Sequence, residues 1–150
     1  MKSLSSLVLT VLFVGSMSCK TTTSNDPMPT GAAKLELIAG KISKSWEITA
    51  IGINNVDVFS LNRACTKDDI FLLNANKTYE LNEGPTKCRT TDVQVYEKGT
   101  WELSADESEL VLNKKSRYKI LELSSSSLKL SNKNLPGEVI DKSYKALSSN

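Results

Sequence analysis

Apolar and polar residues alternate through most of this chain from Trp46 onward. Such alternation puts successive side chains on opposite faces, which is typical of half-buried β-strands. Short polar turns separate the alternating segments, for example at residues 74–77 and 124–127. The pattern therefore predicts a series of short strands joined by tight turns.

A helical pattern precedes these strands, over residues 32–44. Leu35, Ile38 and Ile42 recur there at i, i+3 and i+7, which is the spacing of one helix face. Gly40 lies within the pattern and weakens it, because glycine loses more backbone entropy in a helix than alanine does. We therefore expect one short N-terminal helix.

Two apolar runs on either side of residues 74–77 predict a β-hairpin, in which asparagine adopts the positive φ of the tight turn. A turn centred on Asn76 and Lys77 places Cys65 opposite Cys88, and a centre one residue earlier also leaves the two sulfurs close. The spacing thus predicts a disulfide between these cysteines. The alternative is a pair of free, buried thiols.

The alternating segments number about eight, and no helical crossovers lie between them. The apolar phase switches between Ile120 and Leu123, which predicts a β-bulge near Glu122. Consecutive strands with short connections favour an antiparallel meander, and about eight such strands close into an up-and-down barrel. The predicted fold class is therefore all-β, an eight-stranded antiparallel barrel with one short N-terminal helix.

The start of the chain has the features of an export signal. Lys2 precedes an apolar run at residues 7–14 that is too short to span a bilayer. Small residues then lead to Cys19, an arrangement that resembles a bacterial lipoprotein signal, in which this cysteine is lipidated. The alternative is an ordinary cleaved signal that leaves Cys19 free near the new N-terminus.

These features divide the chain into three predicted parts. Residues 1–18 are a signal peptide, residues 19–32 a disordered tether rich in Thr, Ser, Asn and Pro, and residues 33–150 the barrel domain. Two or more acyl chains on Cys19 anchor a protein stably to a membrane. We expect a bacterial cell-envelope protein anchored to the outer membrane, with the periplasmic face favoured because Asp26, the first acidic residue after Cys19, comes late.

A series of residues recurs in order across most of the predicted barrel: Trp46, Cys65, Asp68, Asp69, Phe71, Tyr79, Cys88, Gly99 and Trp101. This series resembles the lipocalin-like domain of Bacteroidetes lipoproteins. The chain departs from that pattern at residues 43–45, where a glycine is common, and at residues 76–77, where Asp-Gly is usual. The resemblance implies a small calyx but no particular ligand, because lipocalins share architecture more than they share cargo.

An eight-stranded barrel is just wide enough to be filled by its own side chains or to hold one small ligand. Two hypotheses follow. The protein binds a small apolar molecule inside the barrel, or it is a filled barrel that presents residues 83–94 to a protein or glycan partner. The candidate ligand-binding residues are Trp46, Phe71, Tyr79, Trp101, Leu103 and Tyr118.

The composition argues against several other classes of protein. The chain has no histidine, which removes the commonest general base and zinc ligand. Its 19 basic and 17 acidic residues are nearly balanced, and no basic stripe indicates nucleic-acid binding. Asp68 and Asp69 can bind a cation or cap a turn, and capping or plain solvation is favoured because no loop gathers enough oxygen ligands. We expect a monomer that is not an enzyme and has no cofactor or metal.

Overall fold

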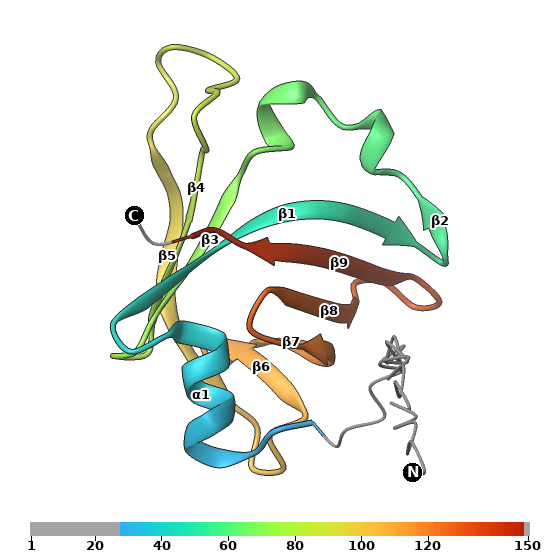
Figure 1. The fold of residues 1–150 in the computed structure, drawn as a ribbon. Coiled ribbons are helices and arrows are strands. Elements are labelled where there is room, and N and C mark those ends of the chain that lie inside the picture. The colour runs from blue at the N-terminus through green and yellow to red at the C-terminus, as the bar shows by residue number, and fades with distance from the viewer. Residues whose placement is uncertain (1–27, 149–150) are drawn as a thin grey trace, which may run out of the picture.

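The computed structural model describes residues 28–148, which form a closed antiparallel barrel (Figure 1). The sheet has nine strands and closes where β1 pairs with β9. The two-residue strand β2 pairs with β1 alone, so the other eight strands form the barrel. The strands are β1 (Ser43–Ile53), β2 (Val56–Asp57), β3 (Ile70–Asn74), β4 (Thr78–Asn82), β5 (Val95–Leu103), β6 (Glu109–Leu112), β7 (Ser116–Leu123), β8 (Ser127–Lys133) and β9 (Val139–Ala146).

The connectivity is that of an up-and-down meander. From β3 to β9, each strand pairs with the one that follows it, and β1 pairs with both β3 and β9. The helix α1 (Gly31–Ala39) lies against one end of the barrel (Figure 1). Two short 3-10 helices, η1 (Phe59–Leu61) and η2 (Ala64–Thr66), lie in the segment at the other end. The predicted fold class is confirmed.

The helix ends earlier than its hydrophobic spacing predicted. α1 stops at Ala39, and Gly40 adopts a φ of 63° and donates its N–H to the Glu36 carbonyl at 2.8 Å. A Cβ at Gly40 would lie 2.9 Å from the Ser43 carbonyl oxygen, so the position requires glycine. Ile42 lies outside the helix and is 82% exposed. The prediction of a helix through residue 44 is wrong because Gly40 terminates the helix instead of only weakening it.

The β3–β4 hairpin forms, but its register differs by one residue from the predicted one. Leu73 lies opposite Tyr79, and both side chains are buried. The positive φ, 70°, falls on Lys77 and not on Asn76, and the Lys77 N–H donates to the Asn74 carbonyl at 3.0 Å. This is a three-residue loop that ends in a left-handed residue, whereas the predicted centre assumed a two-residue turn.

Three β-bulges adjust which side chains face the interior. The register between β7 and β8 shifts between Ile120 and Glu122, which confirms the predicted bulge and leaves Leu121 41% exposed. Two further shifts were not predicted: one between Ile48 and Ala50 of β1, and one between Leu81 and Asn82 where β4 pairs with β5. Each bulge reverses the inward and outward faces of the strand beyond it.

Side chains fill the end of the barrel that α1 covers. Trp46 has no exposed surface, and its indole N–H donates to the Ile38 carbonyl at 2.8 Å, which joins α1 to β1. The Trp101 indole N–H donates to the Asn74 carbonyl at 3.0 Å. The largest fully buried side chains are Trp46, Trp101, Tyr79, Ile38, Leu73, Leu110 and Leu128.

The predicted signal peptide over residues 1–18 and the predicted lipidation site, Cys19, lie outside the described residues. Residues 28–32 of the predicted tether are described, and α1 begins at Gly31, whose N–H donates to the Glu107 carboxylate at 2.8 Å. Between residues 28 and 148, no helix is long and apolar enough to cross a membrane.

Candidate functional site

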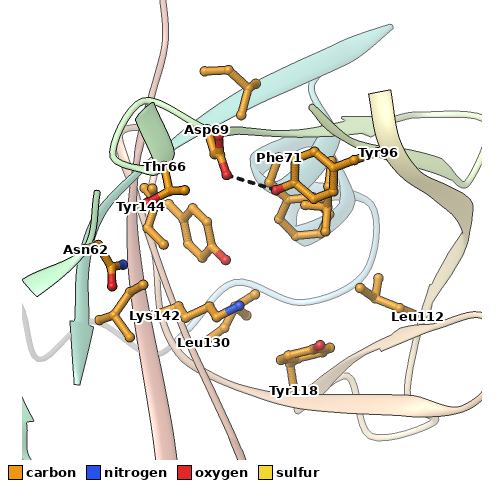
Figure 2. Close-up of a pocket in the computed structure, with 14 residues that line it drawn as sticks. Asn62, Thr66, Asp69, Phe71, Tyr96, Leu112, Tyr118, Leu130, Lys142 and Tyr144 are labelled. Atoms are coloured by element: carbon orange, nitrogen blue, oxygen red, sulfur yellow. Dashed lines mark hydrogen bonds between the residues drawn. The ribbon is translucent and has the colours of Figure 1, made fainter. Parts of the chain in front are cut away.

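A cavity of about 170 Å³ occupies the barrel interior at the end away from α1. The inner faces of the strands form its walls, and residues of the η1–η2 segment contribute to its lining (Figure 2). Most of the lining side chains are apolar or aromatic. They are Ile48, Ile51, Asn62, Thr66, Asp69, Ile70, Phe71, Leu81, Tyr96, Leu112, Tyr118, Leu130, Lys142 and Tyr144.

Strand register explains why these side chains meet. Lys142 of β9 lies opposite Ile51 of β1 and opposite Leu130 of β8. Directly opposed residues of antiparallel strands share a face of the sheet, so these three form one row on the inner wall. The bulge in β1 allows Ile48 and Ile51, three positions apart, both to line the cavity.

Asp69 and Tyr96 form a polar pair in the cavity wall. The Tyr96 hydroxyl donates to Asp69 Oδ2 at 3.1 Å (Figure 2). Burial raises the pKa of the Asp69 carboxyl, the Tyr96 hydrogen bond opposes that rise, and the charges of Glu83 and Asp68 add to it. Burial and the neighbouring Asp69 charge raise the pKa of Tyr96, which keeps this phenol a hydrogen-bond donor at neutral pH.

Lys142 contributes an amine to the cavity. Burial lowers the pKa of this ammonium, while the negative charge of Glu97 opposes the change. Burial also raises the pKa of the Tyr144 and Tyr118 phenols. Both hydroxyls stay protonated at neutral pH, so this part of the wall offers one amine and two neutral O–H donors.

The structure separates the six predicted ligand-binding residues into two groups. Phe71 and Tyr118 line the cavity. The other four lie outside its lining: three are fully buried at the filled end, and the fourth is half-buried against the same core. These four are Trp46, Tyr79, Trp101 and Leu103.

Tyr79 instead belongs to a polar network with Glu97 of β5 and with Asn113, which follows β6. Its hydroxyl donates to Glu97 Oε1 at 2.5 Å and accepts from the Asn113 side-chain amide at 2.9 Å. Asn113 Oδ1 accepts from the Thr100 N–H at 3.0 Å. A Cβ at Gly99 would lie 1.9 Å from Asn113 Oδ1, so glycine leaves the room that Asn113 needs. This close approach gives a physical reason for a glycine two residues before Trp101.

Cys65 and Cys88 form a disulfide with 5.0 Å between their Cα atoms, which confirms the predicted pairing. Cys65 lies in η2 and not in a strand, so the bridge joins two loops at the cavity end of the barrel. Thr66, the next residue, lines the cavity. The disulfide therefore fixes the η1–η2 segment beside the cavity.

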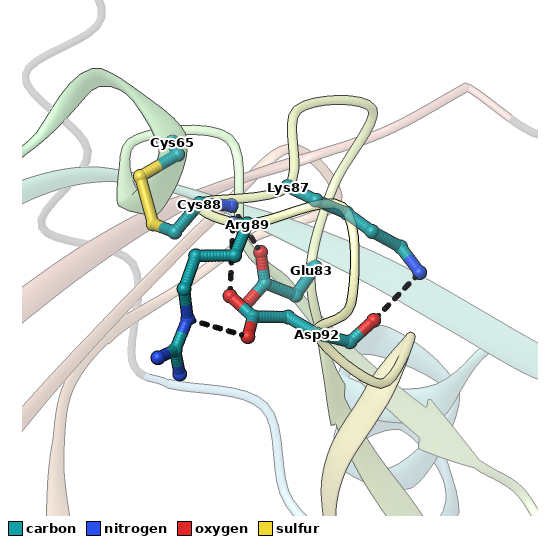
Figure 3. Close-up of polar contacts among 6 residues, drawn as sticks. All are labelled: Cys65, Glu83, Lys87, Cys88, Arg89 and Asp92. Atoms are coloured by element: carbon teal, nitrogen blue, oxygen red, sulfur yellow. Dashed lines mark hydrogen bonds and ion pairs between the residues drawn. A yellow bond between two sulfur atoms is a disulfide. The ribbon is translucent and has the colours of Figure 1, made fainter.

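Polar contacts brace the β4–β5 loop on the other side of this disulfide (Figure 3). Glu83 Oε2 accepts from the Cys88 N–H at 3.1 Å. The Asp92 carboxylate accepts from the Arg89 guanidinium at 3.0 Å, and the Asp92 carbonyl accepts from Lys87 Nζ at 2.8 Å. The loop is thus held by its own side chains as well as by the covalent bond.

Asp68 and Asp69 are engaged by neighbouring donors. Asp68 Oδ2 accepts from the Thr86 N–H at 2.9 Å, while Asp69 accepts from Tyr96. In the described part of the chain, no group of three or more His, Cys, Asp or Glu side chains is placed to hold a metal ion. The contact between Asp68 and Thr86 joins residues 18 positions apart, so it ties two loops together and is not the local turn cap that the sequence predicted.

Sequence reasoning missed Lys142 as a cavity residue. The signal was present in β9, where Ile140, Lys142 and Tyr144 alternate with residues of the opposite face. Because Tyr144 is buried, the same period places Lys142 on the inner wall. A charged residue at an inward position of a strand is a site candidate that can be found from sequence alone.

Comparison with known families agrees with this geometry. A family model described as a lipocalin-like domain matches residues 42–130, more than half of the chain. The chain therefore belongs to the lipocalin-like domain family, as its sequence resemblance predicted. The matched region runs from just before β1 into β8 and excludes β9, which carries Lys142 and Tyr144. A search of the curated proteins found no match.

Proposed function

We propose that this protein binds a small, largely apolar molecule inside its barrel and does not catalyse a reaction on it. The observation that carries the proposal is the cavity, which is walled by Phe71, Leu81, Leu112 and other apolar side chains. Removing an apolar ligand from water into such a site is favourable in proportion to the buried area. We also propose that the protein acts as a monomer; residues of a single chain line the cavity.

The size of the cavity limits the ligand. Its volume of about 170 Å³ is below the roughly 300–1,000 Å³ of sites that hold drug-sized molecules. Apolar cavities of about 150 Å³ bind benzene. We therefore expect a ligand with one ring or a short hydrocarbon chain, and not a long-chain lipid.

Toluene is a suitable neutral probe for this site. We expect toluene to shift the NMR resonances of Phe71, Leu112 and Leu130 in the full chain carrying Cys19→Ser. Leu130→Trp fills the cavity and should weaken toluene binding by about tenfold or more, which corresponds to about 1.4 kcal/mol. Ser131→Trp is the matched control, because Ser131 is the next residue of β8 and points to the opposite face.

Two results would contradict ligand binding in the barrel. One is the absence of saturable toluene shifts at the cavity residues. The other is equal weakening of toluene binding by Leu130→Trp and Ser131→Trp. Either result would favour the second candidate, a filled barrel that presents residues 83–94 to a protein or glycan. The disulfide and the internal contacts of that loop would then hold the binding surface.

We also propose that a lipid on Cys19 anchors the protein to the bacterial outer membrane, facing the periplasm. The apolar run at residues 7–14 and the small residues before Cys19 support this proposal. The chain has three cysteines, and the disulfide uses Cys65 and Cys88, so Cys19 is the one left for lipid. Several acyl chains on one cysteine give stable attachment.

Cell fractionation tests the anchor. The unchanged chain is expected in the outer-membrane fraction, with an intact mass that includes acyl groups, whereas Cys19→Ser should move to the soluble periplasmic fraction. Protease added to intact cells should leave the protein uncut if it faces the periplasm. An unacylated mass, or the same fractionation for both chains, would refute lipid anchoring.

A further inference from the structure

We propose that the ligand of this cavity is a small carboxylic acid whose carboxylate binds the Lys142 amine and the Tyr118 and Tyr144 hydroxyls. The inference rests on the proposed function, because it names the class of molecule that the barrel binds. It adds a charged, directional contact to a site that otherwise recognises apolar surface.

Lys142 is the first observation. It lies on the inner wall, in the row that Ile51 and Leu130 complete on the neighbouring strands. Figure 2 shows its amine pointing into the space that the lining residues surround. Within residues 28–148, its Nζ makes no hydrogen bond or ion pair with the protein. An ammonium that is largely removed from water and has no partner is costly, and an anionic ligand would offset that cost.

Two tyrosine hydroxyls of the same cavity lining share this lack of a partner. Across the described part of the chain, the hydroxyls of Tyr118 and Tyr144 make no hydrogen bond to protein atoms, unlike those of Tyr79 and Tyr96. Neither hydroxyl oxygen is among the fully buried side-chain atoms that lack a hydrogen-bond partner, so both are accessible from the cavity. Figure 2 shows the Tyr144 hydroxyl directed toward the Lys142 amine. Together they present three donor groups, and a carboxylate can accept from all three.

The acidic groups nearby each accept a hydrogen bond, although the second Asp69 oxygen, Oδ1, is buried without a partner. Asp69 accepts from the Tyr96 hydroxyl, and Glu97 accepts from the Tyr79 hydroxyl. Asp69 lies on a different part of the wall from Lys142 in Figure 2, and no ion pair joins the two. No acidic side chain of the described residues lies within ion-pair distance of Lys142, and Glu97 acts on it only through its longer-range charge. A ligand carboxylate would therefore be the first anion in direct contact with this amine.

The charge and shape of the site favour a carboxylate over other anions. Lys142 is the one basic side chain and Asp69 the one acidic side chain in the cavity lining. The single positive charge of the Lys142 ammonium matches the single negative charge of a carboxylate. A phosphate carries more charge and is usually bound by arginine or by several backbone N–H groups. Elsewhere in the same lining, Phe71, Leu81 and Leu112 offer an apolar surface for a ring or short chain.

Benzoate and benzamide test this inference, because they have nearly the same shape and differ in charge. NMR titration of the full chain carrying Cys19→Ser should show benzoate binding about tenfold more tightly than benzamide, as expected for a hydrogen bond to a charged group. Equal affinities, or a preference for benzamide, would overturn the inference. If toluene still binds in that case, the proposed function stands; if all three probes fail to bind, both are overturned.

Lys142→Met and Lys145→Met locate the preference within the protein. The readout is the ratio of benzoate to benzamide affinity, which should fall from about tenfold to about one in Lys142→Met. Lys145 lies on the same strand but outside the barrel, where it pairs with Glu47 at 3.2 Å, so Lys145→Met should keep the ratio. A ratio that survives Lys142→Met, or that falls equally in both variants, would refute the role of Lys142. If Lys142→Met fails to fold, the ratio of benzoate to benzamide affinity in the protein with Lys142 intact still decides the inference.

Discussion

Trp46→Ala is expected to lower the free energy of unfolding by about 3–5 kcal/mol, the usual cost of removing a large aromatic side chain from a core. Trp46 has no exposed surface, so alanine would leave a cavity at the filled end of the barrel. The change also removes the hydrogen bond from its indole to the Ile38 carbonyl at 2.8 Å, which links α1 to β1. Urea denaturation followed by circular dichroism measures the loss without depending on indole fluorescence.

Two further variants separate the causes of this effect. Trp46→Phe keeps an aromatic ring and loses the hydrogen bond, so it should cost about 1–3 kcal/mol because the Ile38 carbonyl is left unpaired. Leu61→Ala, at a position that is 82% exposed, should change stability by less than about 0.5 kcal/mol. A cost below about 1 kcal/mol for Trp46→Ala would mean that the filled end is not a close-packed core.

Removing the disulfide is expected to have the second-largest effect. Cys65→Ser combined with Cys88→Ser should lower the free energy of unfolding by about 3 kcal/mol, because the bridge closes a loop with a sequence separation of 23 residues. Toluene binding should weaken as well, since Thr66 lines the cavity directly after Cys65. On the unmutated chain, urea denaturation midpoints measured with and without a thiol reductant compare the stability of the protein without and with the bridge.

The control for this experiment is Cys19→Ser, which leaves the bridge intact and should not change the midpoint. Weaker toluene binding with an unchanged spectrum elsewhere would locate the effect in the η1–η2 segment. If the double variant and the unmutated chain had the same midpoint in urea, the bridge would contribute no net stability to this barrel.

The errors in the sequence prediction have specific physical causes. The prediction assigns Gly40 only a weakening effect inside a helix that continues to residue 44, whereas its left-handed φ of 63° ends the helix. The hairpin register could have been corrected from the pattern itself. Only the observed register places Leu73 opposite Tyr79, with both on the inner face, whereas the predicted one would have placed Leu73 opposite Glu80.

The strands, the meander, the disulfide partners and the family were all predictable from the sequence, because alternation, turn residues and cysteine spacing are local properties of the chain. The bulge near Glu122 was predictable for the same reason, since the apolar phase switches there. Only the tertiary structure decided that one end of the barrel is filled and the other hollow. That division depends on how side chains from eight strands and α1 share one volume, which places Trp46 and Trp101 in the core and Lys142, Tyr118 and Tyr144 around the cavity.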